Sequence, residues 1–273
     1  MPYLKVSDDT ELYVKDWGTG RPVVLIHGWP LSSDSWDDQA MALADAGYRA
    51  IAYDRRGFGR SSQPWSGYDY DTLADDLKAV LDHTGASDAA IVGFSMGGGE
   101  VARYLSRHGG KNVSQAVLVS SVVPYMLKTA DNPHGVDPSV FDTMTKGMRE
   151  DRAKFFGGFF KDFYGVGLLS SPVSDELLEA SRQVAMQASL KATLACAKAF
   201  ATTDFRPDLA AFKVPTLIIH GTADKTVPID ASSRAAAKGI ERAKLIEYDG
   251  SPHGLLVTDK SRLTADLLAF LRG

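Results

Sequence analysis

The sequence predicts an α/β fold in which a mostly parallel sheet carries helices on both faces. Short apolar, β-prone runs alternate with longer helical patterns through the first half of the chain, and the same rhythm resumes at Val214. Such alternation is typical of strands joined by crossover helices. The chain has 273 residues, enough to bury roughly three quarters of its unfolded surface in one core.

The individual elements follow from this alternation. Strands are expected at residues 11–17, 22–26, 48–53, 89–92 and 113–120, and two more near residues 215–219 and 245–248. Helices are expected at residues 33–46, 70–83, 96–108 and, at the end of the chain, 256–271.

The pattern is lost between residues 122 and 208, a stretch that is helical and rich in loops. We expect it to be a helical cap inserted after the sixth strand, with residues 1–121 and 209–273 forming the core domain. Eight of the twelve phenylalanines lie in this stretch. Aromatic residues at helical spacing usually pack inward, but as a group they also predict an apolar pocket.

Composition excludes several classes of protein. The net charge of −4 and the pI near 5.9 disfavour a nucleic-acid partner, which would require clustered Lys and Arg. The single cysteine, Cys196, has no partner for an internal disulfide, and no apolar run is long enough to span a membrane. We therefore expect a cytoplasmic protein without a membrane partner. No zinc spacing or phosphate loop is present, so no metal or other cofactor is predicted.

The most informative motif is Gly93-Phe94-Ser95-Met96-Gly97, which directly follows an apolar run. A serine between two glycines at a strand-to-helix turn is the pattern of a nucleophile elbow. The turn is tight and strained, so its flanking residues must lack side chains. Ser95 is therefore the candidate nucleophile.

Two further residues follow predicted strands late in the chain. Asp224 comes after the strand near residues 215–219, and His253 comes after the strand near residues 245–248. The carboxyl ends of parallel strands collect functional loops at one edge of a sheet. Asp204 and Asp230 are rival acids, but neither follows an apolar strand as closely as Asp224. The order Ser, Asp, His is the one expected for a catalytic triad on this kind of sheet.

These residue types can perform acyl transfer. A serine hydroxyl is a weak nucleophile, so a neutral His253 would take its proton while Asp224 orients the ring. Two backbone N–H groups must stabilise the oxyanion. One is expected from Met96, the residue after the nucleophile, and the other from Trp29 in the loop after residues 22–26.

The chain resembles the α/β-hydrolase superfamily over essentially its whole length, and within it the cofactor-free haloperoxidases and aryl esterases, also called perhydrolases. The residues that carry this resemblance are 27–30, 54–61, 93–100, 203–206 and 250–255. It implies an α/β-hydrolase fold with an eight-stranded sheet. It also implies hydrolysis of small aryl and alkyl esters, and peracid formation from carboxylic acids and hydrogen peroxide without metal or haem. A homo-oligomer, a trimer or larger, is a further expectation.

Pro30 suggests a basis for the peroxide reaction. A proline shifts the backbone of the oxyanion loop, and a carbonyl there could accept a hydrogen bond from attacking peroxide. The alternative is that Pro30 only stiffens the loop.

Three other functions stay open on the sequence alone. A lactone or lactam hydrolase and a carbon–carbon bond hydrolase would use the same serine, whereas Ser95 disfavours the relatives that use an aspartate nucleophile. A small-molecule receptor on the same fold is the alternative outside enzymes, because fold alone does not fix function. Rapid multiple turnover of a simple ester distinguishes an enzyme from a receptor.

Overall fold

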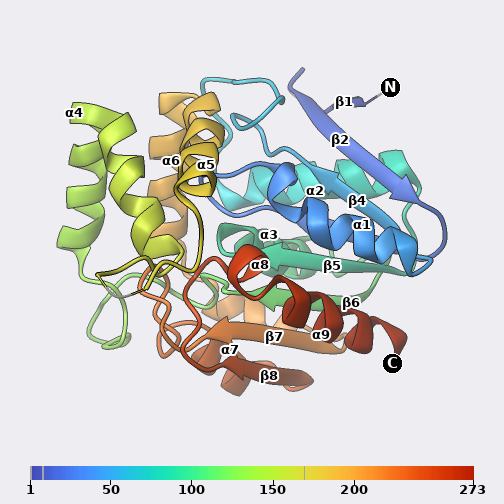
Figure 1. Cartoon of the computed structure of the whole chain (residues 1–273). Coiled ribbons are helices and arrows are strands. Elements are labelled where there is room, and N and C mark those ends of the chain that lie inside the picture. The colour runs from blue at the N-terminus through green and yellow to red at the C-terminus, as the bar shows by residue number, and fades with distance from the viewer. Residues whose placement is uncertain (1, 8, 169) are drawn as a thin grey trace.

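A single eight-stranded sheet runs through the middle of the molecule (Figure 1). The computed structural model of the protein describes residues 2–7, 9–168 and 170–273. The strand order is β1-β2-β4-β3-β5-β6-β7-β8. Only β2 runs against its neighbours, so the sheet is mostly parallel and the predicted fold class is confirmed.

The strands match the apolar runs of the sequence. Those in the middle of the sheet, β3 and β5, are buried at every position, as expected for parallel strands covered on both faces. The bounds are β1 Tyr3–Lys5, β2 Glu11–Gly18, β3 Pro22–Ile26, β4 Arg49–Tyr53, β5 Ala89–Phe94, β6 Val113–Val119, β7 Thr216–Gly221 and β8 Ala243–Tyr248.

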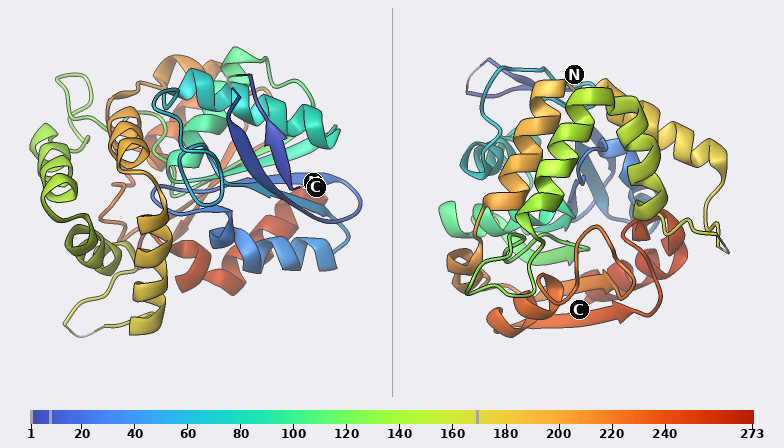
Figure 2. Two further views of the ribbon diagram at one scale, coloured as in Figure 1. Left: turned by 90° about the horizontal axis from the view of Figure 1, so that it is seen from above. Right: turned by 90° about the vertical axis from the view of Figure 1, so that its left-hand side faces the viewer.

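Helices cover both faces of the sheet (Figure 2, left). On one face α1 (Asp37–Asp45) packs against α9 (Lys260–Arg272), and on the other α2 (Tyr70–Thr84) packs against α3 (Met96–Arg107). The ends of α2 show why its bounds fall there. The Asp69 side chain accepts a hydrogen bond from the Thr72 N–H at the start, and Gly85 ends the helix in a left-handed conformation.

Two expected helices differ in detail, and one further helix was not expected. Residues 33–46 form a 3-10 turn, Ser33–Trp36, followed by α1, and the terminal helix is split at Asp259 into α8 (Leu255–Thr258) and α9. The short helix α7 (Ser233–Gly239) was not predicted, because seven residues give too few turns for a clear helical period.

Among the described residues, three α-helices fill most of the stretch between β6 and β7, where the alternation is lost. They are α4 (Pro138–Phe163), α5 (Asp175–Gln187) and α6 (Leu190–Thr202), and they stand together at one end of the sheet (Figure 1; Figure 2, right). Asp151 interrupts α4 with extended backbone angles, and its carboxylate accepts a hydrogen bond from the Lys154 N–H at 2.9 Å. It thus caps the second half of α4. The domain boundaries at residues 122 and 208 stay a prediction.

Within the described part of the chain, no helix combines the length and the apolar character that crossing a membrane requires.

Candidate active site

Ser95 occupies a strained turn between β5 and α3. Its φ of 53° and ψ of −117° are rare for a residue with a side chain, and such strain is common at functional sites. A Cβ atom on Gly93 would lie 2.4 Å from the Gly97 carbonyl oxygen, and one on Gly97 would lie 2.6 Å from the Ile26 carbonyl oxygen. Both glycines therefore permit the close approach of backbone that this turn requires.

The structure brings the three predicted side chains together. His253 Nε2 lies 3.0 Å from Ser95 Oγ, and His253 Nδ1 lies 2.6 Å from Asp224 Oδ2. Both distances are within hydrogen-bond range. The three residues come from the loops after β5, β7 and β8, and all are buried. This is the arrangement in which a carboxylate orients an imidazole toward a nucleophilic hydroxyl.

Four donors surround the Asp224 carboxylate. The backbone N–H groups of Thr226 and Val227 both donate to Oδ1 at 2.8 Å. His220 Nε2 lies 3.1 Å from Oδ2, the oxygen that also contacts His253. Because every lone-pair direction has a donor, the carboxylate is held in one orientation.

The contact of His220 with Asp224 was not identified from the sequence. His220 Nδ1 lies 2.7 Å from Ser233 Oγ, and Nε2 also lies 2.9 Å from the Val227 carbonyl oxygen. A proton on Nε2 can therefore point toward the Val227 carbonyl oxygen and Asp224 Oδ2, which both accept. The position of His220 at the end of β7, just before Asp224, was the available signal.

The environment keeps Asp224 ionised. Burial alone would raise the pKa of this carboxyl, but the neighbouring His253 and the hydrogen bonds from both histidines hold the pKa well below its usual value. A permanent negative charge is what stabilises an imidazolium while His253 holds the serine proton.

Aromatic rings fix the position of His253. The ring of Phe163, at the end of α4, contacts it edge-on with centroids 4.8 Å apart, and Phe94 lies on another side at 5.1 Å. The Gly254 N–H donates to the Phe163 carbonyl oxygen at 2.9 Å. The segment α4–α6 thus contributes to the placement of the histidine, which the sequence had not suggested.

The two predicted oxyanion donors are available. Within the described residues, no acceptor takes the backbone N–H of Trp29 or that of Met96. Met96 begins α3, whose N-terminal N–H groups lack partners in the helix and attract negative charge. The Trp29 indole donates to the Thr193 carbonyl oxygen at 3.1 Å, which ties the loop to α6. Ser95 and Trp29 line the same cavity, and Met96 directly follows Ser95 at the start of α3.

Pro30 follows a cis peptide bond and is buried. Trp29 is among the described residues that line the cavity above Ser95, whereas Pro30 is not. Any influence of Pro30 on the site therefore acts through the backbone of this loop.

A network of buried charged residues contacts the backbone of the loop that contains Trp29 and holds it in place. Arg55 Nε donates to Glu100 Oε1 at 2.5 Å, and another Arg55 nitrogen donates to the His27 carbonyl oxygen at 2.6 Å. Tyr53 donates to the other oxygen of Glu100 at 2.6 Å. Burial, and next the charge of Arg55, lower the pKa of His27 to about 3. The neutral His27 ring accepts a hydrogen bond at Nε2 from the backbone N–H of Arg55, at 2.9 Å.

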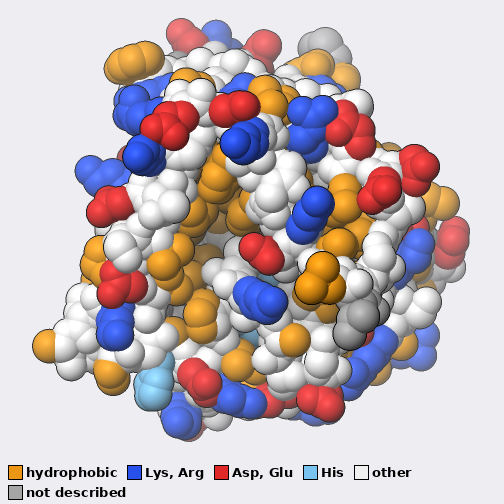
Figure 3. All heavy atoms as spheres, turned by 60° about the vertical axis from the view of Figure 1, so that its left-hand side comes forward, with side chains coloured by type: hydrophobic (Ala, Val, Ile, Leu, Met, Phe, Trp, Pro, Cys, Tyr) orange, Lys and Arg blue, Asp and Glu red, His pale blue; other side chains and the backbone are white. Residues whose placement is uncertain are grey.

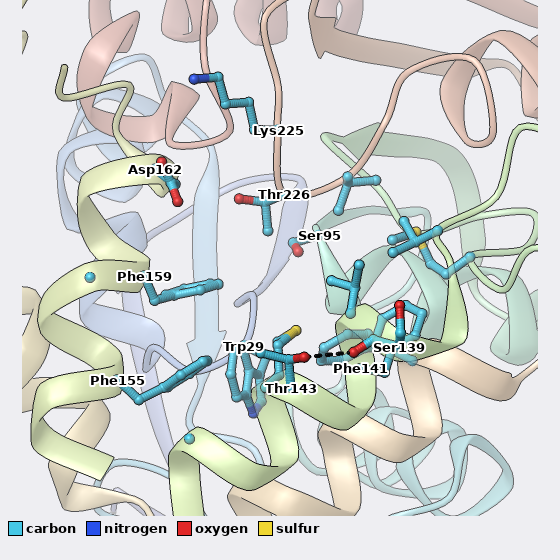
Figure 4. A pocket seen from close by; sticks show the side chains of 18 of the residues that line it. Trp29, Ser95, Ser139, Phe141, Thr143, Phe155, Phe159, Asp162, Lys225 and Thr226 are labelled. Carbon is cyan, nitrogen blue, oxygen red and sulfur yellow. Dashed lines mark hydrogen bonds between the residues drawn. The ribbon is translucent and has the colours of Figure 1, made fainter. Parts of the chain in front are cut away.

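A cavity of about 900 Å³ opens above Ser95. Figure 3 shows hydrophobic side chains gathered around this hollow, and Figure 4 shows Phe155 and Phe159 pointing from α4 toward the same space as Ser95 and Trp29. Phe156 and Phe160, in contrast, are fully buried in the core. The phenylalanines of this segment therefore both line an apolar pocket and pack inward.

The remaining candidates lie elsewhere. Asp204 pairs with Arg206, and Asp230 pairs with Arg234, so the two rival acids are engaged in other contacts. Cys196 is buried in α6, and burial raises the pKa of its thiol to about 12. Among the described residues, no group of three or more His, Cys, Asp or Glu side chains is arranged to hold a metal ion.

Comparison with known proteins places the chain in a family. The model of the alpha/beta hydrolase fold family matches residues 21–260. A bromoperoxidase from Bacillus anthracis has a crystal structure that superposes with a TM-score of 0.94 at 46% identity, covering 97% of this chain and 96% of that one.

Two relatives match this chain over nearly the full length of both proteins. A non-heme chloroperoxidase of Kitasatospora aureofaciens is 44% identical over 99% of both chains, and a bifunctional esterase/perhydrolase of Acinetobacter calcoaceticus is 40% identical over 100% of both. The chain therefore belongs to the α/β-hydrolase fold family, and within it to the group of non-heme haloperoxidases and esterase/perhydrolases. The resemblance stated from the sequence is confirmed.

Proposed function

We propose that the protein is a serine-dependent carboxylic ester hydrolase that acts on small aryl and alkyl esters, with perhydrolase activity as a second reaction of the same site. The observation that carries this proposal is the hydrogen-bonded chain from Ser95 through His253 to Asp224 at the base of an apolar cavity. The esterase/perhydrolase and haloperoxidase relatives support the same reaction class.

In the first half reaction Ser95 Oγ attacks the ester carbonyl carbon while His253 Nε2 takes the hydroxyl proton. The carbonyl oxygen becomes an oxyanion that the N–H groups of Trp29 and Met96 stabilise. Each such donor typically contributes about 3 kcal/mol to the transition state. The carbon–oxygen bond to the alcohol then breaks, and His253 returns the proton to the departing alcohol. The acyl group stays on Ser95.

The second half reaction uses water or hydrogen peroxide as nucleophile. His253 takes a proton from the attacking molecule, and the bond between the acyl carbon and Ser95 Oγ breaks as that oxygen regains a proton. Water gives the carboxylic acid, and peroxide gives the peracid. In the net perhydrolysis a carboxylic acid and hydrogen peroxide form a peracid and water, so no metal or redox cofactor is needed for that step.

Pro30 is the proposed determinant of the choice between water and peroxide. The residue is buried in the loop that supplies the Trp29 N–H, so its ring constrains where that backbone lies. Replacing Pro30 with Leu should lower perhydrolysis more than ester hydrolysis. Equal changes in the two rates would leave Pro30 with a stiffening role only.

The test of the proposed function compares wild type with Ser95→Ala. Turnover of p-nitrophenyl acetate and formation of peracetic acid from acetate and peroxide are followed in parallel. Both activities should be present in wild type and absent from the variant. Absence of both from wild type would contradict the proposal and favour another acyl substrate or a receptor.

A homo-oligomer of three or more chains, implied by the resemblance, and a cytoplasmic location, expected from the composition, complete this proposal. Size-exclusion chromatography with light scattering measures the first, and cell fractionation measures the second.

A further inference from the structure

The cavity above Ser95 is much larger than a small ester requires. Its volume of about 900 Å³ lies near the top of the range of about 300–1,000 Å³ typical of pockets that enclose drug-sized ligands. An acetyl group on Ser95 would fill only a small part of this space.

The wall of the cavity is apolar where it is deepest. Apart from Ser95, its buried members are all hydrophobic, namely Trp29, Val122, Met126, Phe200 and Val227. The charged members are all exposed and therefore lie at the rim, namely Glu150, Asp151, Lys154, Asp162 and Lys225. A ligand that reaches past the rim therefore meets hydrocarbon and aromatic surface.

One face of α4 forms a side of this wall. Phe155, Gly158, Phe159 and Asp162 all line the cavity, and their spacing of three and four residues puts them on one face of the helix. Gly158 is the one member of this set without a side chain. Gly158 is exposed, and a Cβ atom built on it would meet no heavy atom within 4 Å outside its own stretch of helix, so the space in front of Gly158 is open.

We propose that the preferred substrates are esters with a long apolar group, and that Gly158 is the position that keeps the entrance of the cavity open for it. This inference rests on the proposed function and extends it beyond small esters. The apolar group would lie along Phe155 and Phe159, where each buried methylene can improve binding up to about fourfold.

The substrate test varies chain length at constant chemistry. In one arm p-nitrophenyl acetate, butyrate, hexanoate and octanoate keep the leaving group fixed, and in the other methyl, butyl and hexyl acetate keep the acyl group fixed. In one arm, the highest kcat/KM among the longer esters should exceed that for the shortest ester by about tenfold or more. That arm identifies whether the acyl or the alcohol part occupies the cavity.

The residue test uses a matched pair of adjacent glycines. Gly158→Leu places a side chain in the cavity, whereas Gly157→Leu adds the same side chain at a position that also has open space but does not line the cavity. Leucine favours a helix more than glycine does, so both variants should fold, which thermal unfolding verifies. In the arm that gains from chain length, the ratio of kcat/KM between the hexyl-length ester and the shortest ester should fall about threefold or more in Gly158→Leu. The same ratio should stay at the wild-type value in Gly157→Leu.

The outcomes separate this inference from the proposed function. The inference is overturned if the wild type hydrolyses p-nitrophenyl acetate but its kcat/KM does not rise with longer groups in either arm. The proposed esterase function would be unaffected by that result. An equal ratio in the two leucine variants also overturns the role of Gly158. A wild type without turnover of any ester, acetate included, contradicts the proposed function itself.

Discussion

The loops at the end of the sheet and the helical segment α4–α6 contribute to the same site by different physical means. Around Ser95 and Asp224 nearly every polar atom has a partner, and backbone N–H groups supply much of the hydrogen bonding. The segment α4–α6 contributes mainly aromatic surface, including the rings of Phe155, Phe159 and Phe163.

This difference has a functional meaning. Hydrogen bonds and buried charges act over short distances and specific angles, so the loops at the sheet edge tolerate little change. Apolar contact depends on area and volume, so a wall of hydrophobic side chains can change in shape without loss of chemistry. We therefore expect substitutions at the sheet edge to affect kcat or stability, and substitutions in α4–α6 to affect substrate choice.

Among substitutions that keep Ser95, the largest effect is expected from Asp224→Asn. An amide cannot accept all four hydrogen bonds, and its NH₂ group would favour the wrong tautomer of His253. The kcat for p-nitrophenyl acetate should fall about 10⁴-fold. Asp204→Asn serves as the control, because this rival acid pairs with Arg206 and should leave the rate within about twofold of wild type.

Glu100→Gln tests the buried network. The change leaves the Arg55 guanidinium buried without a counter-charge, and it should lower the free energy of unfolding by about 3 kcal/mol or more. Urea unfolding followed by circular dichroism measures the loss. The comparison is Glu179→Gln on α5, which removes an exposed pair with Arg182 and should leave the urea midpoint unchanged.

His27 predicts how stability depends on pH. Its pKa is lowered to about 3 in the folded protein, mainly by burial and then by Arg55, so below pH 6.5 the unfolded chain gains a proton that the native state does not. The contribution of His27 to the free energy of unfolding is fully present above pH 6.5. It decreases as the pH falls toward 3, with a slope of about 1.4 kcal/mol per pH unit.

Urea midpoints measured between pH 7 and 4 test this dependence. His27→Gln should show a shallower loss than wild type over that range, whereas the exposed His134→Gln should keep the wild-type slope. Parallel curves for wild type and His27→Gln would exclude His27 as the source.

His220 should affect catalysis moderately. His220→Ala removes one donor from Asp224 Oδ2, and a lost hydrogen bond to a charged group corresponds to about a tenfold lower kcat. His220→Gln retains an N–H donor on a side chain of similar length and should restore part of the rate. Equal rates for the two variants would mean that the donor is unimportant and only the packing matters.

The smallest effect is expected in the segment α4–α6. Phe159→Leu removes part of an aromatic contact with Trp29, whose ring centroid lies 5.3 Å away, but it keeps the wall apolar. The KM for p-nitrophenyl esters should change about two- to fivefold with kcat nearly constant. A large loss of kcat would show that α4 positions the catalytic groups as strictly as the sheet edge does.

The order of strands and helices and the candidate site residues could be predicted from the sequence because both depend on local signals. The apolar runs of β3 and β5 identify buried parallel strands, and the two glycines around Ser95 identify a tight turn. Asp224 and His253 were predicted because each directly follows such a run. Breaks such as the one at Asp259 were missed, since a single residue does not disturb the helical period.

The sequence by itself determined the α/β alternation, the elbow at Ser95 and the order of its partners, because these follow from periodicity and from residues next to each other in the chain. Only the tertiary structure decided that His220 contacts Asp224, that Phe163 packs on His253, and that Gly158 faces open space. Such contacts join residues from different elements or depend on how a helix is rotated. Long-range packing sets both of these, and no local pattern in the chain records them.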